Sequence, residues 1–205
     1  MNLNNVVERI KQLPEAYVDC NFGQGRDTVL KQLEERSGEN EEYSVDLDIE
    51  SAKNSIQELI ERFAPYEIPG DYISFLEVYG GLAIDSDNSY FSILGTGPMV
   101  EDWYGSIDGH NVFWELEKQG FLTLGSLNFR RNHQHKFQYL SFFLDLAAIV
   151  QKDCVIGVGP WGAKTLTPID IIPEMNRYSD KWRIFANSFT EWLAQAAETD
   201  GGFGF

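Results

Sequence analysis

The stretch Ile68-Pro-Gly-Asp-Tyr-Ile-Ser-Phe-Leu-Glu-Val-Tyr-Gly-Gly81 has the clearest structural pattern in the chain. Its large apolar side chains recur at intervals of three and four residues, at Tyr72, Phe75, Leu76 and Tyr79. This spacing predicts an α-helix with one buried face. Asp71 stands near the positive end of that helix, where a carboxylate is favourable. Gly80 and Gly81 are expected to end it, because glycine adopts the left-handed conformation without steric cost.

A second helix is expected immediately before this stretch, over roughly residues 51–64. Its apolar side chains follow the same spacing, at Ile56, Leu59, Ile60 and Phe63. The segment Pro65-Tyr-Glu-Ile-Pro69 then breaks the helix, because proline interrupts helical hydrogen bonding. Two consecutive amphipathic helices joined by so tight a turn should pack against each other as a corner.

The middle of the chain predicts strands. Four short segments are apolar or alternating and are bounded by Gly, Pro, Asn or Asp: Tyr90–Leu94, Gly120–Gly125, Tyr139–Leu146 and Cys154–Val158. A helix over Asn111–Gln119 is expected between the first two. The longest apolar run, Leu140–Val150, is interrupted by Ser141 and Asp145 and is interpreted as one or two buried strands. It is far shorter than the ~20 residues that span a bilayer.

Near the C-terminus another helix is predicted. One apolar stripe comprises Phe185, Phe189, Trp192, Leu193 and Ala196. Ser188 and Glu191 have the spacing of a capping box, in which the serine side chain binds a backbone N–H of the first helical turn. The tail Asp200–Phe205 is expected to fray.

The N-terminal third predicts helices and acidic loops. Its first helix has one apolar face, formed by Val6, Ile10 and Leu13, and ends at Pro14. Asp27 is expected to be the N-cap of a second helix, which extends through Glu35 and has Leu30 and Leu33 on its inward face. The acidic segment Glu34–Glu50 is interpreted as a solvated connector. Residues 1–49 are therefore set apart as an extension, 50–197 as an α+β domain with an antiparallel-rich sheet flanked by helices, and 198–205 as a flexible tail.

Composition limits the classes of function. The chain has 205 residues, of which 43% are hydrophobic, enough to bury a core. It has 32 acidic residues against 16 basic ones, a net charge of −16. The negative electrostatic field of such a charge repels nucleic acid and anionic membranes, so binding to either is disfavoured. The same field would steer a basic protein toward the chain. Acidity can also serve solubility alone. The N-terminus lacks the pattern of a signal peptide, which predicts a cytoplasmic protein.

Motifs for chemistry are weak. His133 and His135 could lie on one side of a strand, but they stand in a basic, polar segment that suits an exposed turn better than a metal. The segment that begins at Asp85 resembles the start of a calcium-binding EF-hand loop, but it lacks the glycine and the final glutamate that such a loop requires. Pro160 and Trp161 interrupt a Gly-x-Gly-x-x-Gly spacing, so we expect no nucleotide there.

The two cysteines, Cys20 and Cys154, are far apart in unlike contexts. They are interpreted as reduced thiols, with a disulfide, a metal site or a catalytic thiol as the alternatives. The apolar surroundings of Cys154 should raise its pKa and make it inert. We therefore expect a protein that is not an enzyme and uses no cofactor and no metal.

The stretch from Ile68 to Gly81 resembles the signature of the SUKH superfamily (Smi/Knr type), in which an aliphatic-Pro-x-Asp-Tyr segment leads into a Phe-Leu helix ending in Asn-Gly-Gly. Tyr79 stands where that asparagine is usual. The segment Ile184–Leu193 is similar to the closing helix of the family. The resemblance covers roughly residues 50–196, and the segment 97–135 is longer than the family pattern suggests.

The resemblance implies a non-enzymatic α+β domain. Most bacterial members look like immunity proteins, which bind and block a cognate polymorphic or contact-dependent toxin, while related eukaryotic proteins act as regulatory scaffolds. An immunity protein for a nuclease toxin would benefit from acidity, because nuclease surfaces are basic. The predicted partner-binding loops place acids beside aromatics, at Asp85, Asp87, Glu101, Asp102, Trp103, Tyr104 and Asp108. The alternative is that the two aromatics belong to the core and the acids are ordinary loop charges.

Overall fold

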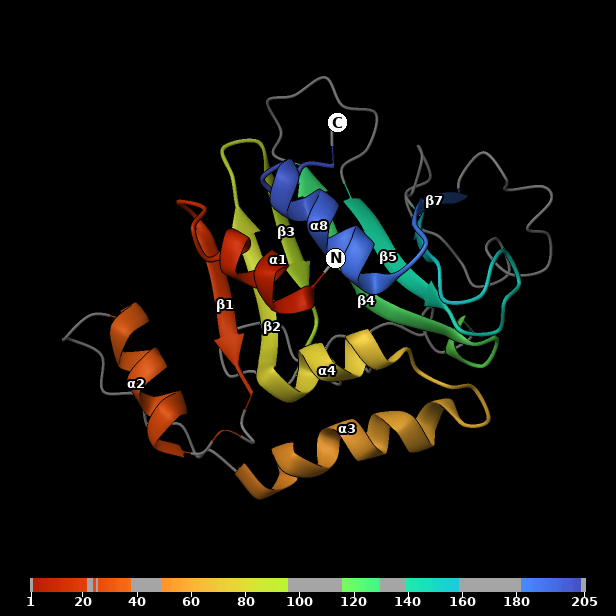
Figure 1. Ribbon diagram of the computed structural model, residues 1–205, viewed down its shortest axis with the longest axis horizontal. Coiled ribbons are helices and arrows are strands. Elements are labelled where there is room, and N and C mark those ends of the chain that lie inside the picture. The colour runs from red at the N-terminus through yellow and green to blue at the C-terminus, as the bar shows by residue number, and fades with distance from the viewer. Residues whose placement is uncertain are drawn as a thin grey trace.

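The computed structural model describes residues 2–21, 24, 26–37, 49–95, 116–129, 139–158 and 182–203. These residues form a seven-stranded antiparallel sheet with helices, so the predicted α+β class is confirmed (Figure 1). The strands lie across the sheet in chain order: β1 (Ala16–Cys20), β2 (Tyr79–Asp85), β3 (Ser89–Ile93), β4 (Phe121–Phe129), β5 (Tyr139–Asp145), β6 (Val155–Val158) and β7 (Trp182–Ala186). The described helices are α1 (Leu3–Ile10), α2 (Arg26–Ser37), α3 (Ile49–Phe63), α4 (Gly70–Val78) and α8 (Phe189–Glu198).

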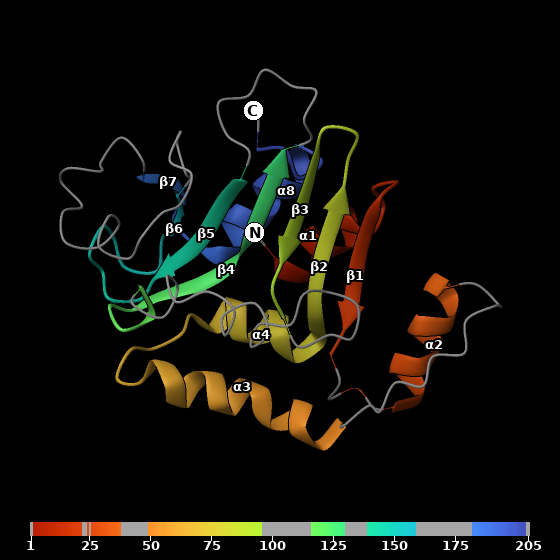
Figure 2. The same cartoon turned by 180° about the vertical axis from the view of Figure 1, so that it is seen from behind.

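Helices α1 and α8 cover one face of the sheet, and in the view from behind the sheet stands in front of them (Figures 1 and 2). The alternation of each strand explains this arrangement, because every second side chain points to the helical face. On β2 these are Leu82 and Ile84, and on β5 they include Phe142 and Leu144, all of them buried. The predicted strands β3 to β6 are confirmed, with bounds shifted by a few residues.

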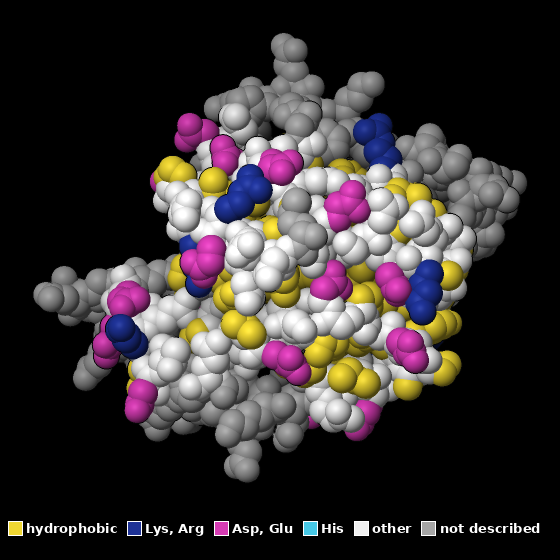
Figure 3. Space-filling view, viewed as in Figure 1, with side chains coloured by type: hydrophobic (Ala, Val, Ile, Leu, Met, Phe, Trp, Pro, Cys, Tyr) yellow, Lys and Arg dark blue, Asp and Glu magenta, His cyan; other side chains and the backbone are white. Residues whose placement is uncertain are grey.

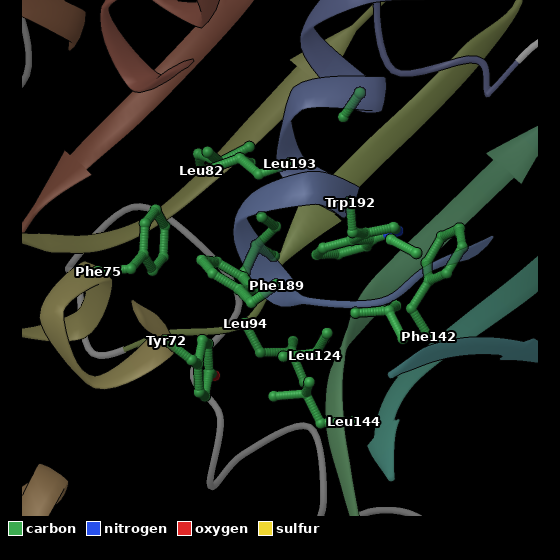
Figure 4. Packing of buried hydrophobic residues seen from close by; sticks show 14 of the residues in the cluster. Tyr72, Phe75, Leu82, Leu94, Leu124, Phe142, Leu144, Phe189, Trp192 and Leu193 are labelled. Atoms are coloured by element: carbon green, nitrogen blue, oxygen red, sulfur yellow. The ribbon is translucent and has the colours of Figure 1, made fainter. Parts of the chain in front are cut away.

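Aromatic rings from several elements contact one another in the core (Figure 4). The Trp192 ring of α8 lies 5.3 Å from that of Phe91 and 4.9 Å from that of Phe142, centroid to centroid. The Phe189 ring lies 4.9 Å from that of Tyr72 and 5.2 Å from that of Phe75, both in α4. The predicted stripes of α4 and α8 therefore meet each other as well as the sheet.

Helices α3 and α4 are consecutive and in contact, as predicted (Figure 1). In α3, Leu59 and Phe63 are buried, whereas Ile60 is exposed although the spacing placed it on the same stripe. The reason is that only part of α3 faces the core, so its apolar stripe is wider than the surface that covers it. Its partner α4 begins at Gly70 and leads directly into β2.

The N-terminal residues, set apart as an extension from sequence, belong to the same core and sheet as far as Cys20. In α1, Val6, Val7 and Ile10 are buried, and the helix packs against α8. Strand β1 pairs with β2. Its outer edge is covered by Gln32 of α2, whose side chain accepts a hydrogen bond from Cys20 N at 2.7 Å and donates one to Val18 O at 2.5 Å.

Three local predictions at helix ends were wrong. The glycines at 80 and 81 do not end α4, because Tyr79 is already extended and both glycines lie within β2. Asp27 lies in the first turn of α2 rather than at its N-cap, since the helix begins at Arg26. Phe185 belongs to β7 and reaches the core from that strand rather than from α8.

The segment after α8 folds back toward the core as far as it is described. Gly201 N donates to Ala196 O at 2.9 Å, and Phe203 N donates to the Thr199 hydroxyl at 2.8 Å. The Phe203 ring lies 5.0 Å from that of Phe142. Residues 199–203 thus close one end of the aromatic core, where the sequence pattern led us to expect fraying.

Candidate functional site

The turn between β2 and β3 holds the two described residues of the predicted acidic site. Asp85 is half-buried at the end of β2, and its backbone N–H donates to the Glu15 carbonyl oxygen at 2.9 Å. Asp87 is exposed within the turn. The other predicted residues lie outside the described part of the chain: Glu101, Asp102, Trp103, Tyr104 and Asp108. The structure therefore brings together Asp85, Asp87 and the exposed Glu15.

Two serines close this turn and give it a defined shape. Ser86 N donates to Ser89 O at 2.9 Å, and the two hydroxyl oxygens lie 3.0 Å apart. In register with Asp85 stands Tyr90, which is exposed at the start of β3. Sequence reasoning missed Tyr90, although the alternation of β3 placed it on the face opposite Phe91. The turn thus presents carboxylates beside an aromatic ring.

Acidic side chains dominate the exposed surface of the described residues. The exposed acids are Glu8, Glu15, Asp27, Glu34, Glu35, Glu58, Glu61, Glu67, Glu77, Asp87, Glu191, Glu198 and Asp200. The exposed bases are Arg9, Lys11, Lys31, Lys118, Lys152 and Arg183. Of these bases, Arg9, Lys11 and Lys31 already contact a glutamate of the same chain. The surface is therefore suited to a partner of opposite charge.

A second defined loop, between β5 and β6, is organised by Asp145. This carboxylate is fully buried and accepts three backbone hydrogen bonds, from Ile149 N at 3.0 Å, Val150 N at 2.5 Å and Gln151 N at 3.2 Å. The loop also contains two non-glycine residues with positive φ, one of them Ala148 at 55°. The sequence predicted buried strands over Leu140–Val150, and this is only partly correct. The strand ends at Asp145, and the loop that follows turns outward and exposes residues 148–150.

This loop lies against the connection between α3 and α4. A Cβ added to Gly120 would lie 2.7 Å from Cβ of Ala147 and 3.0 Å from the ring of Tyr66, so the three segments meet there. Burial raises the pKa of the Asp153 carboxyl, Lys152 opposes the rise, and the charges of Asp71, Glu67 and Asp145 add to it. Several carboxylates therefore lie near one another around this loop, with Lys152 beside them.

The thiols lack the environment of nucleophiles. Cys20 and Cys154 are both buried and unpaired. Burial raises the pKa of each to about 11, and the nearest aspartate of each adds to the rise. The predicted rise in the pKa of Cys154 is thus confirmed, and both thiols are protonated at neutral pH.

Other candidates for chemistry are few. Among the described residues no three His, Cys, Asp or Glu side chains stand close enough to hold a metal ion. His133 and His135 lie outside the described ranges. The interrupted glycine-rich segment begins at Gly157 in β6, and its residues 159–162, which include Pro160 and Trp161, also lie outside them. No described helix is long and apolar enough to cross a membrane.

The residues that resemble the SUKH signature form structural contacts. Asp71 receives hydrogen bonds from Thr190 in α8. Tyr72 and Phe75 of α4 pack on Phe189, which also lies in α8. The two segments of the resemblance, far apart in sequence, therefore lie side by side (Figure 4).

Comparison with protein-family models finds no match for this chain, and a sequence search of curated proteins finds none either.

Proposed function

We propose that this chain is a non-enzymatic immunity protein of the SUKH type, which binds and neutralises a cognate bacterial toxin in the cytoplasm. The observation that supports the proposal best is the contact between its two SUKH-like segments, through Asp71 and Thr190. A short motif can arise by chance in sequence, but two such motifs that pack on each other behave as parts of one structural unit. The proposal otherwise rests on the resemblance.

Charge supports a basic toxin domain, such as a nuclease, as the partner. The net charge is −16, and the exposed acids of the described chain include Asp87 in a well-defined turn. Opposite charge on a partner would speed its association and help exclude other proteins. A negative surface can also compete with the phosphate backbone for the basic site of a nuclease. Binding by this surface requires no catalytic group in the immunity protein.

The test is co-expression with the protein encoded immediately upstream, followed by purification of the complex and a growth assay. We expect stable co-purification and rescue of growth. An Asp85→Asn, Asp87→Asn double variant should slow association several-fold at low salt and lose that effect at high salt, because exposed charges act mainly on the association rate. A Glu58→Gln, Glu77→Gln double variant removes the same number of charges from exposed positions in α3 and α4, away from the turn, and serves as the control.

No binding and no rescue would contradict the proposal. A regulatory scaffold of the Smi/Knr type would then be the better hypothesis, with several weaker partners in place of one toxin. Binding that is unaffected by the double variant would leave immunity standing and would remove the β2–β3 turn from the interface.

A further inference from the structure

The tip of the β5–β6 loop exposes two adjacent large aliphatic side chains. Ile149 is 47% exposed and Val150 is 39% exposed. Among the described large hydrophobic residues they are the only two exposed neighbours in sequence. Exposed apolar side chains gain most from burial when they stand together, and their exposure here is enforced by the shape of the loop.

The shape of the loop is built in before any partner binds. The buried Asp145 carboxylate accepts hydrogen bonds from the backbone N–H groups of Ile149, Val150 and Gln151. The side-chain amide of Gln151 donates to Oδ1 of Asn187 at 3.1 Å. A tip fixed in this way loses little conformational entropy on binding, which favours affinity. This is the property expected of a binding anchor.

The tip does not stand alone. The half-buried Ala147, three residues before Val150, packs near Tyr66, whose ring is half-buried in the α3–α4 connection. Figure 3 shows hydrophobic side chains gathered over this connection and the neighbouring loop, with acidic side chains among them. We name Tyr66, Ala147, Ile149 and Val150 the loop-tip surface.

Acidic groups border the loop-tip surface. Glu67 is exposed directly after Tyr66, and Asp153 closes the loop. The charges of Glu67 and Asp71 both act on Asp153, so these carboxylates share one region. Lys152 is the basic side chain in that group. An apolar centre with a charged rim is the usual composition of a protein interface.

We propose that the loop-tip surface is a docking site for a basic protein partner. Ile149 and Val150 enter an apolar pocket of the partner, and basic side chains around that pocket pair with Glu67 and Asp153. The charge of the rim and the net charge of −16 argue for a basic partner over a second copy of this acidic chain. The inference rests on the proposed function and adds a contact region well separated from the β2–β3 turn (Figure 1).

The test compares variants of the full chain in binding to the co-purified upstream protein. An Ile149→Ser, Val150→Ser double variant should raise Kd by about tenfold or more, mainly through faster dissociation. An Ile184→Ser, Val78→Ser double variant is the matched control, because it also removes one exposed isoleucine and one exposed valine, at 49% and 42%, outside the loop-tip surface. Its Kd should stay within about twofold of wild type. Glu67→Gln should slow association about two- to fivefold at low salt only.

Each alternative result has a definite meaning. If the double variant binds like wild type while it unfolds normally in denaturant, the loop-tip surface is excluded and the proposed function stands. If wild type itself does not bind the upstream protein, both proposals fail together. If the chain dimerises in size-exclusion chromatography and the double variant does not, the surface serves a second copy and the proposed partner is wrong.

Discussion

The carboxylate of Asp71 in α4 accepts two hydrogen bonds from Thr190 in α8, 119 positions later in the chain. Its Oδ2 receives the backbone N–H of Thr190 at 2.9 Å and the hydroxyl at 2.8 Å. Its Oδ1 lies 3.0 Å from the backbone N–H of Tyr72. One side chain thus accepts from donors in the first turns of two helices, where backbone N–H groups often lack intrahelical partners. The Tyr72 N–H also donates to Pro69 O at 3.1 Å, so Thr190 depends more on this carboxylate.

Removal of this carboxylate should destabilise the fold. We expect Asp71→Ala to lower the free energy of unfolding by about 2–3 kcal/mol, because hydrogen bonds to charged groups contribute about 1.5–3 kcal/mol and the two donors of the half-buried Thr190 lose their acceptor. Asp71→Asn should cost less, since its amide oxygen can still accept. Equilibrium unfolding in urea measures both values.

Asp87→Ala is the control for this prediction, because Asp87 is exposed in a turn. Its effect should stay within about 0.5 kcal/mol. Equal effects at the two positions would mean that the link between α4 and α8 contributes nothing to stability.

The hydroxyl of Tyr72 is a second unusual feature of α4. Tyr72 is fully buried, its hydroxyl oxygen has no hydrogen-bond partner among the described residues, and burial raises the pKa of the phenol. We expect Tyr72→Phe to leave stability unchanged or to raise it by up to about 1 kcal/mol, because a buried hydroxyl without a partner carries a desolvation cost.

Thermal unfolding of Tyr72→Phe and Tyr72→Leu separates the hydroxyl from the ring. The leucine variant should lower stability by more than 1 kcal/mol, since it leaves space where the ring contacts Phe189. A loss of similar size in the phenylalanine variant would reveal a hydrogen bond to the hydroxyl and contradict the prediction.

Periodicity alone predicted most of the packed elements. The helical stripes of α1, α3, α4 and α8 and the alternating strands β3 to β6 are visible in sequence, because each buries a regular set of apolar side chains. Ser188 also caps α8 as its spacing predicted, with its hydroxyl 3.1 Å from Glu191 N. The glutamate side chain, however, accepts from Asn187 N, one residue earlier than the predicted box requires.

The elements that were missed depend on distant partners. Strand β1 is only five residues long and half-buried in part, so its sequence carries no alternation strong enough to identify it. Strand β7 was assigned in part to the following helix, because Phe185 stands four residues before Phe189 and so fits the apolar stripe of α8. Of the candidate site, the sequence located the Asp85–Asp87 turn but not the loop-tip surface, because the exposure of Ile149 depends on the buried Asp145.

The glycines of β2 show how one residue type can be misread. They were expected to end a helix, but Gly81 has a φ of 139° within a strand, and Gly80 lies against Gly95. A Cβ on Gly95 would collide with the carbonyl oxygen of Gly80. We expect Gly95→Ala to cost about 3 kcal/mol, since two buried backbones would have to separate.

Gly70→Ala is the matched control for Gly95→Ala. Nothing lies within 4 Å of a Cβ at Gly70, which is the first residue of α4. That variant should be neutral or more stable by up to about 1 kcal/mol, because alanine loses less backbone entropy than glycine. The urea midpoint of Gly95→Ala should therefore fall, whereas that of Gly70→Ala should stay the same or rise.

Asp145 is expected to control both stability and the order of the β5–β6 loop. Asp145→Ala would leave three backbone N–H groups without their acceptor and should cost about 2–4 kcal/mol. Hydrogen exchange gives the local readout, because the amides of Ile149, Val150 and Gln151 should lose protection before the rest of the sheet. Unchanged exchange at these amides in a folded variant would contradict the role assigned to Asp145.

The two thiols predict a loss of stability at alkaline pH. The pKa of each is raised from 9.0 to about 11, chiefly by burial, so between those values the folded chain holds protons that the unfolded chain releases. Stability from this source is complete below about pH 9 and falls as the pH rises toward 11. Because one pKa unit corresponds to about 1.4 kcal/mol, each thiol should contribute at most about 2–3 kcal/mol to the fall. A Cys20→Ala, Cys154→Ala variant should show a shallower decline than wild type when unfolding in urea is measured from pH 8 to 11. Parallel curves for the two proteins would mean that the thiols ionise alike in the folded and unfolded chains.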